Sequence, residues 1–343
     1  MSLRGRNEVR VMNKRPNIAI VGATGVVGNT FLKVLEERDF PFENAYLMAS
    51  ERSAGKTVTF KGRDYIVELL DEHSFDKDID IALFSAGGGT SAKFAPIAAA
   101  HGVTVVDNSS QWRMDPEVPL VVPEVNPDDA FDNKGIIANP NCSTIQAVVA
   151  LKPLYDAYGI KRVVYSTYQA VSGSGVKGIR DLEEGLKGND IKVAYPHPIA
   201  GNCLPHIDVF MENGYTKEEI KMINETRKIL GDQDIPVTAT TVRVPVFDSH
   251  SESINVEFKK PFGDVDEIRK VFSGKPGLVV LDDPANNVYP LARDAAGRDE
   301  VFVGRIRRDF SVESGINFWC VSDNIRKGAA TNAVQIAELL LKD

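Results

Sequence analysis

A cysteine at a strand-to-helix turn is the residue of this sequence best suited to chemistry. Cys142 lies in the stretch Asn-Pro-Asn-Cys-Ser-Thr at 139–144, after an apolar strand predicted over 135–138 and before an apolar helix that Ser143 or Thr144 could cap. A thiol in the first turn of a helix lies at the positive end of the helix dipole, which favours the nucleophilic thiolate. Free cysteine is also among the most buried residue types, so the turn alone does not separate a catalytic cysteine from a structural one.

Glycines between a strand and a helix form a second candidate site. The strand predicted over 17–21 runs into Gly-Ala-Thr-Gly-Val-Val-Gly at 22–28, and a helix is predicted over 29–38. This order is typical of a dinucleotide site, because the glycines let the backbone approach a pyrophosphate that rests on the helix N-terminus. The spacing is less common than G-x-G-x-x-G, and an ordinary tight turn is the alternative. The candidate cofactor residues here are Gly22, Thr24, Gly25, Val26, Val27 and Gly28.

The end of the next predicted strand, 44–49, indicates which dinucleotide binds. An NAD site usually has an acidic residue there to bond the ribose 2′-hydroxyl, whereas an arginine accommodates the 2′-phosphate of NADP. Arg52 and Ser53 follow this strand, so we predict NADP and expect Glu51 to point to solvent. A later strand, 80–85, ends in a glycine turn that we also expect to border the cofactor. The candidates at these strand ends are Ser50, Arg52, Ser53, Ser85 and Gly87.

Other polar residues are weaker candidates when each is considered alone. Arg113 follows a predicted strand, where an anion contact is the better interpretation than a free surface charge. Gln169 ends an alternating strand and could be an edge residue or an amide that bonds a substrate. Glu218 and Lys221 lie on a helix predicted over 217–230, where a solvated charged face is the simpler interpretation.

The composition is typical of a globular protein, and the chain is long enough for two domains. The chain has 343 residues, of which 43% are hydrophobic and 26% charged. Its apolar runs are all shorter than a bilayer requires, so we predict no membrane partner. A formal net charge of −8 argues against a general nucleic-acid binder, which needs basic surface to neutralise phosphates. We therefore expect small-molecule partners.

The cysteines and histidines indicate the cellular compartment and do not follow the usual spacing of metal ligands. The three cysteines are far apart and form no CxxC pair, which is typical of a reducing cytoplasm and gives no thiolate zinc site. The histidines outside position 250 do not form a metal set, so we predict no metal: His73, His101, His197 and His206. Residues 1–16 are polar and no apolar segment follows them, so we predict a disordered extension without a secretory signal.

The order of predicted elements defines the fold class. Strands and helices alternate up to about residue 141, which predicts an α/β, doubly wound, Rossmann-type NADP-binding domain over 17–141. Alternating β-rich segments then dominate an α+β catalytic and dimerisation domain over 142–322, with a mixed, largely antiparallel sheet. An amphipathic helix predicted over 324–341 packs back on the first domain, which we therefore extend by residues 323–343. The later strands are predicted over 237–246, 251–260, 277–281, 301–308 and 315–321.

Several motifs in order resemble the aspartate-β-semialdehyde dehydrogenase family from about residue 17 to the C-terminus. The most specific pieces are Asn-Cys-Ser-Thr at 141–144, Thr-Tyr-Gln-Ala at 167–170 with Ser-Gly at 172–173, and Arg243 followed seven residues later by His250. The glycine motif with its downstream Arg-Ser pair agrees in order and spacing. We expect a compact loop between Gly175 and Lys217, and its short length is more similar to the Gram-positive-type branch of that family than to the longer enterobacterial one.

The resemblance implies reduction of L-4-aspartyl phosphate by NADPH to L-aspartate 4-semialdehyde and phosphate, a step toward lysine, methionine and threonine. It implies a homodimer and an acyl-thioester on Cys142, with His250 as acid/base and Gln169 orienting the substrate. It further implies substrate contacts from Asn141, Arg243 at the α-carboxylate, Arg113 and Lys221 at the phosphate, and Glu218 near the amine or beside Lys221. The remaining cofactor contacts that it implies are Ser172, Gly173 and Asn324.

This chemistry is consistent with the residue types. A thiolate attacks an acyl phosphate readily, and the resulting thioester gives hydride an electrophilic carbon. Backbone N–H groups at the start of the Cys142 helix are the predicted donors to the oxyanion. A histidine is the ordinary proton carrier near neutral pH, although His250 without its spacing from Arg243 would suggest only a structural role. The alternatives are N-acetyl-γ-glutamyl-phosphate reductase, which shares the thioester chemistry, and a non-catalytic dinucleotide-binding paralogue.

Overall fold

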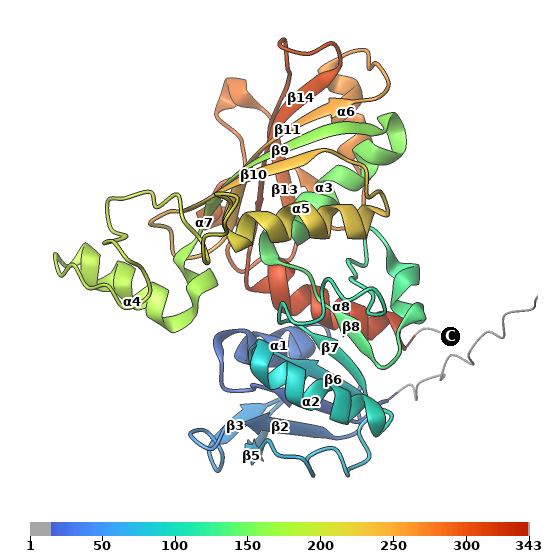
Figure 1. Ribbon diagram of the computed structural model, residues 1–343, viewed down its shortest axis with the longest axis vertical. Coiled ribbons are helices and arrows are strands. Elements are labelled where there is room, and N and C mark those ends of the chain that lie inside the picture. Colours follow the sequence, from blue (N-terminus) through green and yellow to red (C-terminus); the bar gives the residue numbers. More distant parts are fainter. Residues whose placement is uncertain (1–14, 342–343) are drawn as a thin grey trace, which may run out of the picture. The chain divides into compact units, whose positions relative to one another are not determined.

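The computed structural model describes residues 15–341, which divide into two compact units (Figure 1). The first unit comprises the described residues up to Asn139 together with those from Ala333, and the second unit is Pro140–Asn332. The expected division placed residues 323–332 with the first domain, whereas the contacts place them in the second unit. The predicted disordered extension falls, for residues 1–14, outside the described residues.

A six-stranded parallel sheet forms the centre of the first unit, in the order β5-β2-β1-β6-β7-β8. Strands β1 and β6 are buried at every position, as expected for parallel strands covered on both faces. Strand order reverses between β1 and β6, which is where doubly wound sheets bind ligands. The strands are β1 Ile18–Val21, β2 Ala45–Ala49, β5 Glu68–Leu69, β6 Ile81–Phe84, β7 Thr104–Asp107 and β8 Ile136–Ala138. The prediction of a doubly wound α/β domain is confirmed.

Helices join these strands, and the last one comes from the end of the chain. Arg38, at the end of α1, donates to both carboxylate oxygens of Glu338 at 2.8 and 2.7 Å. Gln335 donates to Glu124 at 3.1 Å, so the C-terminal helix is tied to the first unit at two places. The helices are α1 Val26–Glu37, α2 Gly88–Ala100, η1 Pro127–Asp132 and α8 Thr331–Leu339. A separate hairpin of β3 Thr57–Phe60 and β4 Arg63–Ile66 was not predicted.

The second unit is built on a six-stranded mixed sheet in the order β10-β9-β11-β14-β13-β12. The outer pairs β10–β9 and β12–β13 are parallel, and the three inner pairs are antiparallel. The prediction of a mixed, largely antiparallel sheet is therefore confirmed. The strands are β9 Ile160–Gln169, β10 Val237–Arg243, β11 His250–Phe258, β12 Leu278–Val280, β13 Val301–Arg308 and β14 Gly315–Ser322.

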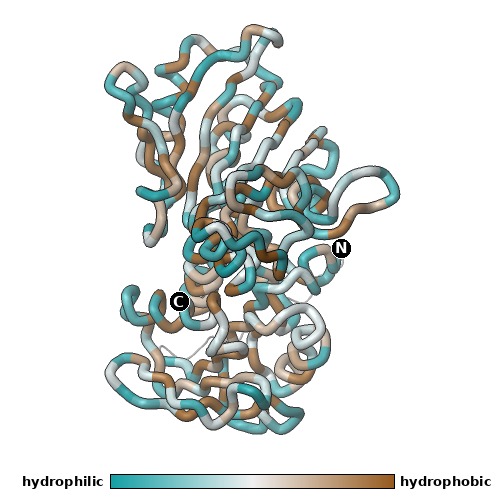
Figure 2. Tube along the Cα trace, turned by 90° about the vertical axis from the view of Figure 1, so that its left-hand side faces the viewer, coloured by the Kyte–Doolittle hydropathy of each residue, from teal (hydrophilic) through white to brown (hydrophobic). Residues whose placement is uncertain are grey.

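Helices α3 Cys142–Tyr158, α5 Lys217–Leu230 and α6 Val265–Phe272 pack on one face of this sheet. Strand β11 shows the resulting alternation, because its even-numbered residues from 250 onward are buried while most odd-numbered ones are half-buried. The same change between hydrophobic and hydrophilic residues is visible along the long strands of the unit (Figure 2). The alternation places His250 among the buried residues of β11, a strand that α3 contacts.

Two segments differ from their predicted structure. Residues 175–186 form α4 Gly175–Leu186 rather than loop, and Leu182 packs there with Val171, Tyr195 and Leu204 in a small separate core. The predicted C-terminal helix is split, because η4 Arg326–Ala330 is a π-helix and α8 begins only at Thr331. The short elements of the unit are η2 Val171–Ser174, η3 Pro284–Asn286 and α7 Ala292–Ala295. Within residues 15–341, every helix is too short or too polar to cross a membrane.

Candidate active site

Cys142 is the first residue of α3 and is half-buried. The cap of this helix is Asn141, whose Oδ1 accepts hydrogen bonds from the backbone N–H groups of Ser143 at 3.0 Å and Thr144 at 3.3 Å. The prediction that Ser143 or Thr144 is the cap is therefore wrong, and the helix starts three residues earlier than expected. The cap also occupies two amides that we expected to bind the oxyanion. The helix dipole still favours the thiolate.

A glycine of the π-helix closes the space behind the thiol. A Cβ atom at position 328 would lie 3.0 Å from Cβ and 3.3 Å from Cα of Cys142. Any larger residue would therefore displace the cysteine or the helix. Single turns of π-helix occur often at functional sites, and here the turn presents Gly328 to Cys142. The sequence carries no signal for this packing.

Three of the predicted site residues surround the buried carboxylate of a fourth, Glu218. Oε1 of Glu218 accepts from Nδ2 of Asn141 at 2.9 Å and from Nε2 of Gln169 at 3.1 Å, and Oε2 accepts from Nζ of Lys221 at 3.1 Å. Lys221 also donates to Asp208 at 2.7 Å. Burial raises the pKa of Glu218, but the charge of Lys221 and the three hydrogen bonds outweigh it and leave the pKa below its ordinary value. The simple interpretation of Glu218 as part of a solvated face is wrong.

Arg243 and His250 meet above the glycine turn that follows β9. Arg243 lies beside Gln169 in the parallel register of β10 and β9, and its Nη1 donates to the carbonyl of Ala170 at 2.5 Å. A Cβ at position 173 would lie 3.0 Å from Nη1 of Arg243 and 3.4 Å from Nε2 of His250, so both side chains face Gly173. Nε of Arg243 and Nε2 of His250 are buried and have no hydrogen-bond partner among the described residues. Buried donors of this kind indicate a place for a ligand.

His250 is fixed on its other side by the backbone. Its Nδ1 accepts from the N–H of Ala170 at 3.0 Å, and its carbonyl accepts from Nε2 of Gln146 at 3.2 Å. The preceding residue, Ser249, has φ of 73°, a conformation that is strained for a residue other than glycine. Burial, and then the charge of Arg243, hold the pKa of His250 well below its ordinary value.

Ser172 and Asn324, two of the predicted cofactor residues, also lie at this end of β11. Nδ2 of Asn324 donates to Oγ of Ser172 at 3.0 Å, and Oδ1 of Asn324 accepts from the N–H of Ser249 at 2.9 Å. Both side chains are buried. Asn324 therefore holds the strained turn before His250, whatever it contacts in a ligand, and its role toward a cofactor stays a prediction.

The first unit has a cavity of about 290 Å³ at the carboxyl ends of β1, β2 and β6. Its position agrees with a dinucleotide site at the reversal of strand order. The predicted residues that line it are Gly22, Thr24, Gly25, Ser50, Arg52, Ser53 and Ser85. Sequence reasoning missed the other lining residues because they belong to no motif: Ala49 at the end of β2, Leu70 after β5, Ala86 after β6, and Thr90 and Phe94 on α2. The predicted Val26, Val27, Gly28 and Gly87 do not line it.

Two positions of the glycine motif require glycine for different physical reasons. A Cβ at Gly28 would lie 2.1 Å from the carbonyl oxygen of Gly22, so this glycine lets α1 pack on the preceding turn. A Cβ at Gly22 would lie 2.4 Å from the carbonyl oxygen of Ser85, and its φ is 88°. Beside the glycines, Oγ1 of Thr24 donates to Oγ of Ser53 at 3.0 Å, while Glu51 is exposed as expected.

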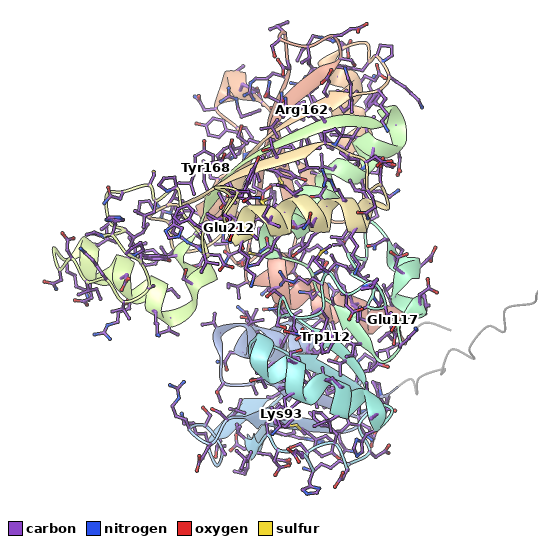
Figure 3. All side chains as sticks on the ribbon, in the orientation of Figure 1. Lys93, Trp112, Glu117, Arg162, Tyr168 and Glu212 are labelled. Carbon is purple, nitrogen blue, oxygen red and sulfur yellow. The ribbon has the colours of Figure 1, made fainter. Side chains whose placement is uncertain are left out.

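Arg113 belongs to the first unit and is buried rather than free on the surface. Its Nε donates to the carbonyl of Asn139 at 2.9 Å, and its Nη2 donates to the carbonyl of Asn108 at 3.1 Å. The neighbouring Trp112 (Figure 3) donates to Oγ of Ser91 at 2.9 Å. An anion contact for Arg113 stays a prediction. Among residues 15–341, the His, Cys, Asp and Glu side chains form no group of three or more that could hold a metal ion.

One unit is parallel and doubly wound with a glycine-lined cavity, and the other carries a thiol at a helix start and two side chains with buried nitrogens without partners among the described residues. Together these features define a dinucleotide-dependent oxidoreductase. Two family models match the chain: "Semialdehyde dehydrogenase, NAD binding domain" over residues 17–132, and "Semialdehyde dehydrogenase, dimerisation domain" over residues 151–327. The aspartate-semialdehyde dehydrogenase of Aquifex aeolicus is 63% identical and covers 95% of this chain and 98% of that protein. The chain therefore belongs to the aspartate-semialdehyde dehydrogenase family.

Solved structures agree with this assignment. The crystal structure of aspartate semialdehyde dehydrogenase II from Vibrio cholerae is 52% identical, with a TM-score of 0.92 over 96% of this chain and 99% of that one. A second structure from the same organism, complexed with ASA, is 51% identical with a TM-score of 0.91 and the same coverage. A Candida albicans relative with NADP is 28% identical, with a TM-score of 0.75 over 95% and 98% of the two chains.

The comparisons do not support the Gram-positive-type branch that we expected. The Bacillus subtilis relative is 47% identical over 96% of this chain and 99% of that protein, below the Aquifex aeolicus relative at 63%. The length of the segment between Gly175 and Lys217 is therefore not diagnostic of that branch. The relatives do not favour the N-acetyl-γ-glutamyl-phosphate reductase alternative. An NAD(P)-binding domain is supported at this coarser level.

Proposed function

We propose that the protein reduces L-4-aspartyl phosphate with NADPH to L-aspartate 4-semialdehyde and phosphate, through an acyl-thioester on Cys142. The observation that carries this proposal is that the side chains of Arg243 and His250 both face Gly173, in the unit whose α3 begins with the thiol. Each has a buried nitrogen, Nε of Arg243 and Nε2 of His250, without a hydrogen-bond partner among the described residues. The step lies in the biosynthesis of lysine, methionine and threonine, as the family name suggests.

The chain's own residues perform the acyl transfer. The Cys142 thiolate, favoured by the dipole of α3, attacks the acyl carbon, and phosphate departs because it is a good leaving group. The bound nicotinamide supplies the hydride that reduces the thioester. Cys142 is then expelled as thiolate and the aldehyde is released. Gly328 supports this by fixing the position of the cysteine backbone.

Charged residues of the second unit match the groups of the substrate. The planar guanidinium of Arg243 binds the α-carboxylate in a bidentate manner, and Glu218 lies near the α-amine. Lys221 and Arg113 are the two cations that we assign to the phosphate. Gln169 and Asn141 hold Glu218 through the bonds of 3.1 and 2.9 Å, and so orient the substrate indirectly as well as by contact.

NADP is the dinucleotide that the first unit fits best. The cavity at the strand ends is lined by Arg52 and Ser53, where a 2′-phosphate would find a cationic side chain and a hydroxyl. Gly22 and Gly25 leave the backbone open to the pyrophosphate. The NADP-containing Candida albicans relative supports this choice. We assign the remaining cofactor contacts to Ser172, Gly173 and Asn324, and the two units to an NADP-binding domain and a catalytic and dimerisation domain.

A homodimer would cover the outer face of the second unit's sheet. Tyr168 (Figure 3) is 39% exposed there and its ring lies 5.3 Å from that of Trp319. A cavity of about 440 Å³ is lined by Tyr168 and Trp319, by the half-exposed Leu291, and by Arg305 and Arg307. Exposed aromatic and apolar side chains of this kind mark association surfaces. The three cysteines form no disulfide in the described part of the chain, which is consistent with the cytoplasm, where we expect the enzyme to act.

The test is reduction of NADP by L-aspartate 4-semialdehyde with and without phosphate, with NAD in a parallel series. We expect turnover that requires phosphate and prefers NADP. The control is Cys142→Ala, which should bind NADP like the parent and show no turnover. Phosphate-independent turnover, or near-normal turnover of the alanine variant, would exclude the thioester route.

A further inference from the structure

Helix α4 and the chain that follows it form a small hydrophobic core with the glycine turn after β9. Helix α4 lies to one side of the second unit's sheet (Figure 1). The buried side chains of this core are Val171, Leu182, Tyr195, Ile199 and Leu204. None of them belongs to the proposed acyl transfer, but Tyr195 contacts a residue that does.

The ring of Tyr195 faces the guanidinium of Arg243. Cζ of Arg243 lies 5.8 Å from the centroid of the ring, which is within the range of a cation–π contact. Both side chains are buried, and this strengthens the contact because water no longer competes for the cation. Adjacent carbonyls of the turn hold the two groups, since Nη1 of Arg243 donates to Ala170 at 2.5 Å and Oη of Tyr195 donates to Val171 at 3.4 Å. The turn therefore keeps the ring and the guanidinium side by side.

Asp181, on α4, fixes the segment that carries this ring. Its Oδ2 accepts from the backbone N–H groups of Val193 at 3.0 Å, Ala194 at 2.8 Å and Tyr195 at 3.3 Å. The carboxylate is buried, and charge-assisted hydrogen bonds of this kind are strong. A Cβ atom at Gly178, one turn earlier in α4, would lie 2.5 Å from Oη of Tyr195, so this glycine leaves room for the hydroxyl. Helix α4 thus positions both the backbone and the hydroxyl end of Tyr195.

Arg243 needs this support because one hydrogen bond does not fix the plane of its guanidinium. The group is planar, donates only from its edges, and binds a carboxylate through two parallel N–H groups. The bond from Nη1 to Ala170 holds one corner, about which the plane could still turn. Nε is buried and has no hydrogen-bond partner among the described residues. An aromatic ring against the face of the guanidinium removes the rotation and leaves the other edges available to a ligand.

We propose that Tyr195 is a positioning residue, whose ring holds the guanidinium of Arg243 in the plane that receives the carboxylate of the substrate. This inference rests on the proposed function, which assigns the α-carboxylate to Arg243. A binding group that is held in place before the substrate arrives costs less to order in the complex. The carboxylate stays bound throughout acyl transfer and hydride transfer, so the gain is equal in the ground state and the transition state. Such a gain lowers KM and leaves kcat unchanged.

The kinetic test separates the ring of Tyr195 from its hydroxyl. Tyr195→Leu removes the ring, and we expect it to raise KM for L-aspartate 4-semialdehyde about 5–30-fold, with kcat and the KM for NADP nearly unchanged. Tyr195→Phe keeps the ring and loses only the long bond to Val171, so its KM should stay within about twofold of the parent. Asp181→Ala frees the segment that carries the ring and should also raise KM. Because it acts through the ring, adding it to Tyr195→Leu should raise KM no further.

The matched control is Tyr158→Leu, which removes a similarly buried ring at the other end of α3 from the thiol. Tyr158 packs on Phe258 and Phe262, and its hydroxyl donates to Glu267 at 2.7 Å. We expect this variant to keep the parent's KM. The proposal is overturned if Tyr195→Leu changes KM less than about twofold, if it lowers kcat with KM unchanged, or if Tyr158→Leu raises KM as much.

Urea unfolding tests the contact without turnover. Tyr195→Leu, Arg243→Met and the double variant are compared with the parent. If the ring and the guanidinium stabilise each other, the double variant loses less stability than the sum of the two single losses. Additive losses would overturn the proposal even if the aldehyde assay succeeds. If the parent shows no turnover while the losses are non-additive, the proposed reaction is wrong and the positioning of Arg243 by Tyr195 holds.

Discussion

The capping residue Asn141 joins the thiol-bearing helix to the buried carboxylate, and its removal should be costly. Asn141→Ala would delete the cap bonds to the N–H groups of Ser143 and Thr144 and the 2.9 Å bond to Glu218. Loss of an N-cap costs about 1 kcal/mol. Loss of a buried hydrogen bond to a charged group costs about 1.5–3 kcal/mol. We therefore expect the free energy of unfolding of the second unit to fall by about 3 kcal/mol.

Asn141→Ser separates the two contributions. Serine also caps helices but is too short to reach Glu218, so we expect it to cost about 2 kcal/mol, about 1 kcal/mol less than alanine. Both variants keep the backbone bond from residue 141 to Glu225, which is 2.6 Å in the parent. The comparison therefore tests the side chain alone.

Urea unfolding followed by fluorescence reports on the second unit if Trp112 is first replaced by phenylalanine. The chain has two tryptophans, and Trp319 is then the only one left. The variants are compared in this background at neutral pH. Equal stability of Asn141→Ala and Asn141→Ser would mean that the cap contributes nothing. If Asn141→Ala lowered the free energy of unfolding by less than about 0.5 kcal/mol, neither the cap nor the bond to Glu218 would contribute as argued.

Three further predictions concern single residues. Arg52→Ala should weaken NADP about 10–100-fold in equilibrium binding and leave NAD nearly unchanged, because one charge-assisted contact to the 2′-phosphate is lost; equal weakening of both would contradict the assignment. Gly28→Ala should destabilise the first unit by more than about 2 kcal/mol in denaturant unfolding, because its Cβ would lie 2.1 Å from a backbone oxygen. The control Gly25→Ala, whose Cβ would lie 3.4 Å from the nearest such atom, should cost less than about 1 kcal/mol. A larger loss for Gly25→Ala than for Gly28→Ala would refute the packing argument. The pKa of Glu218 is lowered on folding, so its contribution is present above the unfolded value of about 4.3 and is lost as pH falls through the folded value. Stability of the parent should therefore drop more steeply below about pH 4 than that of Glu218→Gln, and parallel curves would show that the carboxylate is not stabilised by folding.

The local sequence pattern was sufficient to predict the elements whose hydrophobic residues repeat regularly over a long stretch. The strands of both sheets follow from apolar runs and alternation, and the turns at Gly22 and Cys142 follow from glycine, proline and asparagine between a strand and a helix. Arg243 and His250 could be proposed as neighbours only through the family resemblance. Their spacing alone does not show that β10 and β11 flank β9, which is what brings both side chains to Gly173.

Features that depend on distant partners could not be predicted. The charges of α5 gave no sign that Glu218 faces inward, because its bonds come from Asn141 and Gln169, 77 and 49 residues away. Helix α4 was missed because glycines at its start suggested a loop, and only its packing with Tyr195 and Leu204 explains it. The cap of α3 was assigned to the wrong residue because asparagine, serine and threonine all cap helices well.

The first unit is discontinuous along the chain, and this has a consequence for its synthesis on the ribosome. Its six strands emerge first, but the helix segment that bonds through Gln335 to Glu124 and through Glu338 to Arg38 emerges last, after the whole second unit. Domains usually fold as they emerge. Here some two hundred residues are synthesised between the strands of the first unit and the helix that packs on them. Until that helix emerges, the surface that it covers stays exposed, so the nascent first unit is the part most open to chaperones and proteases during translation.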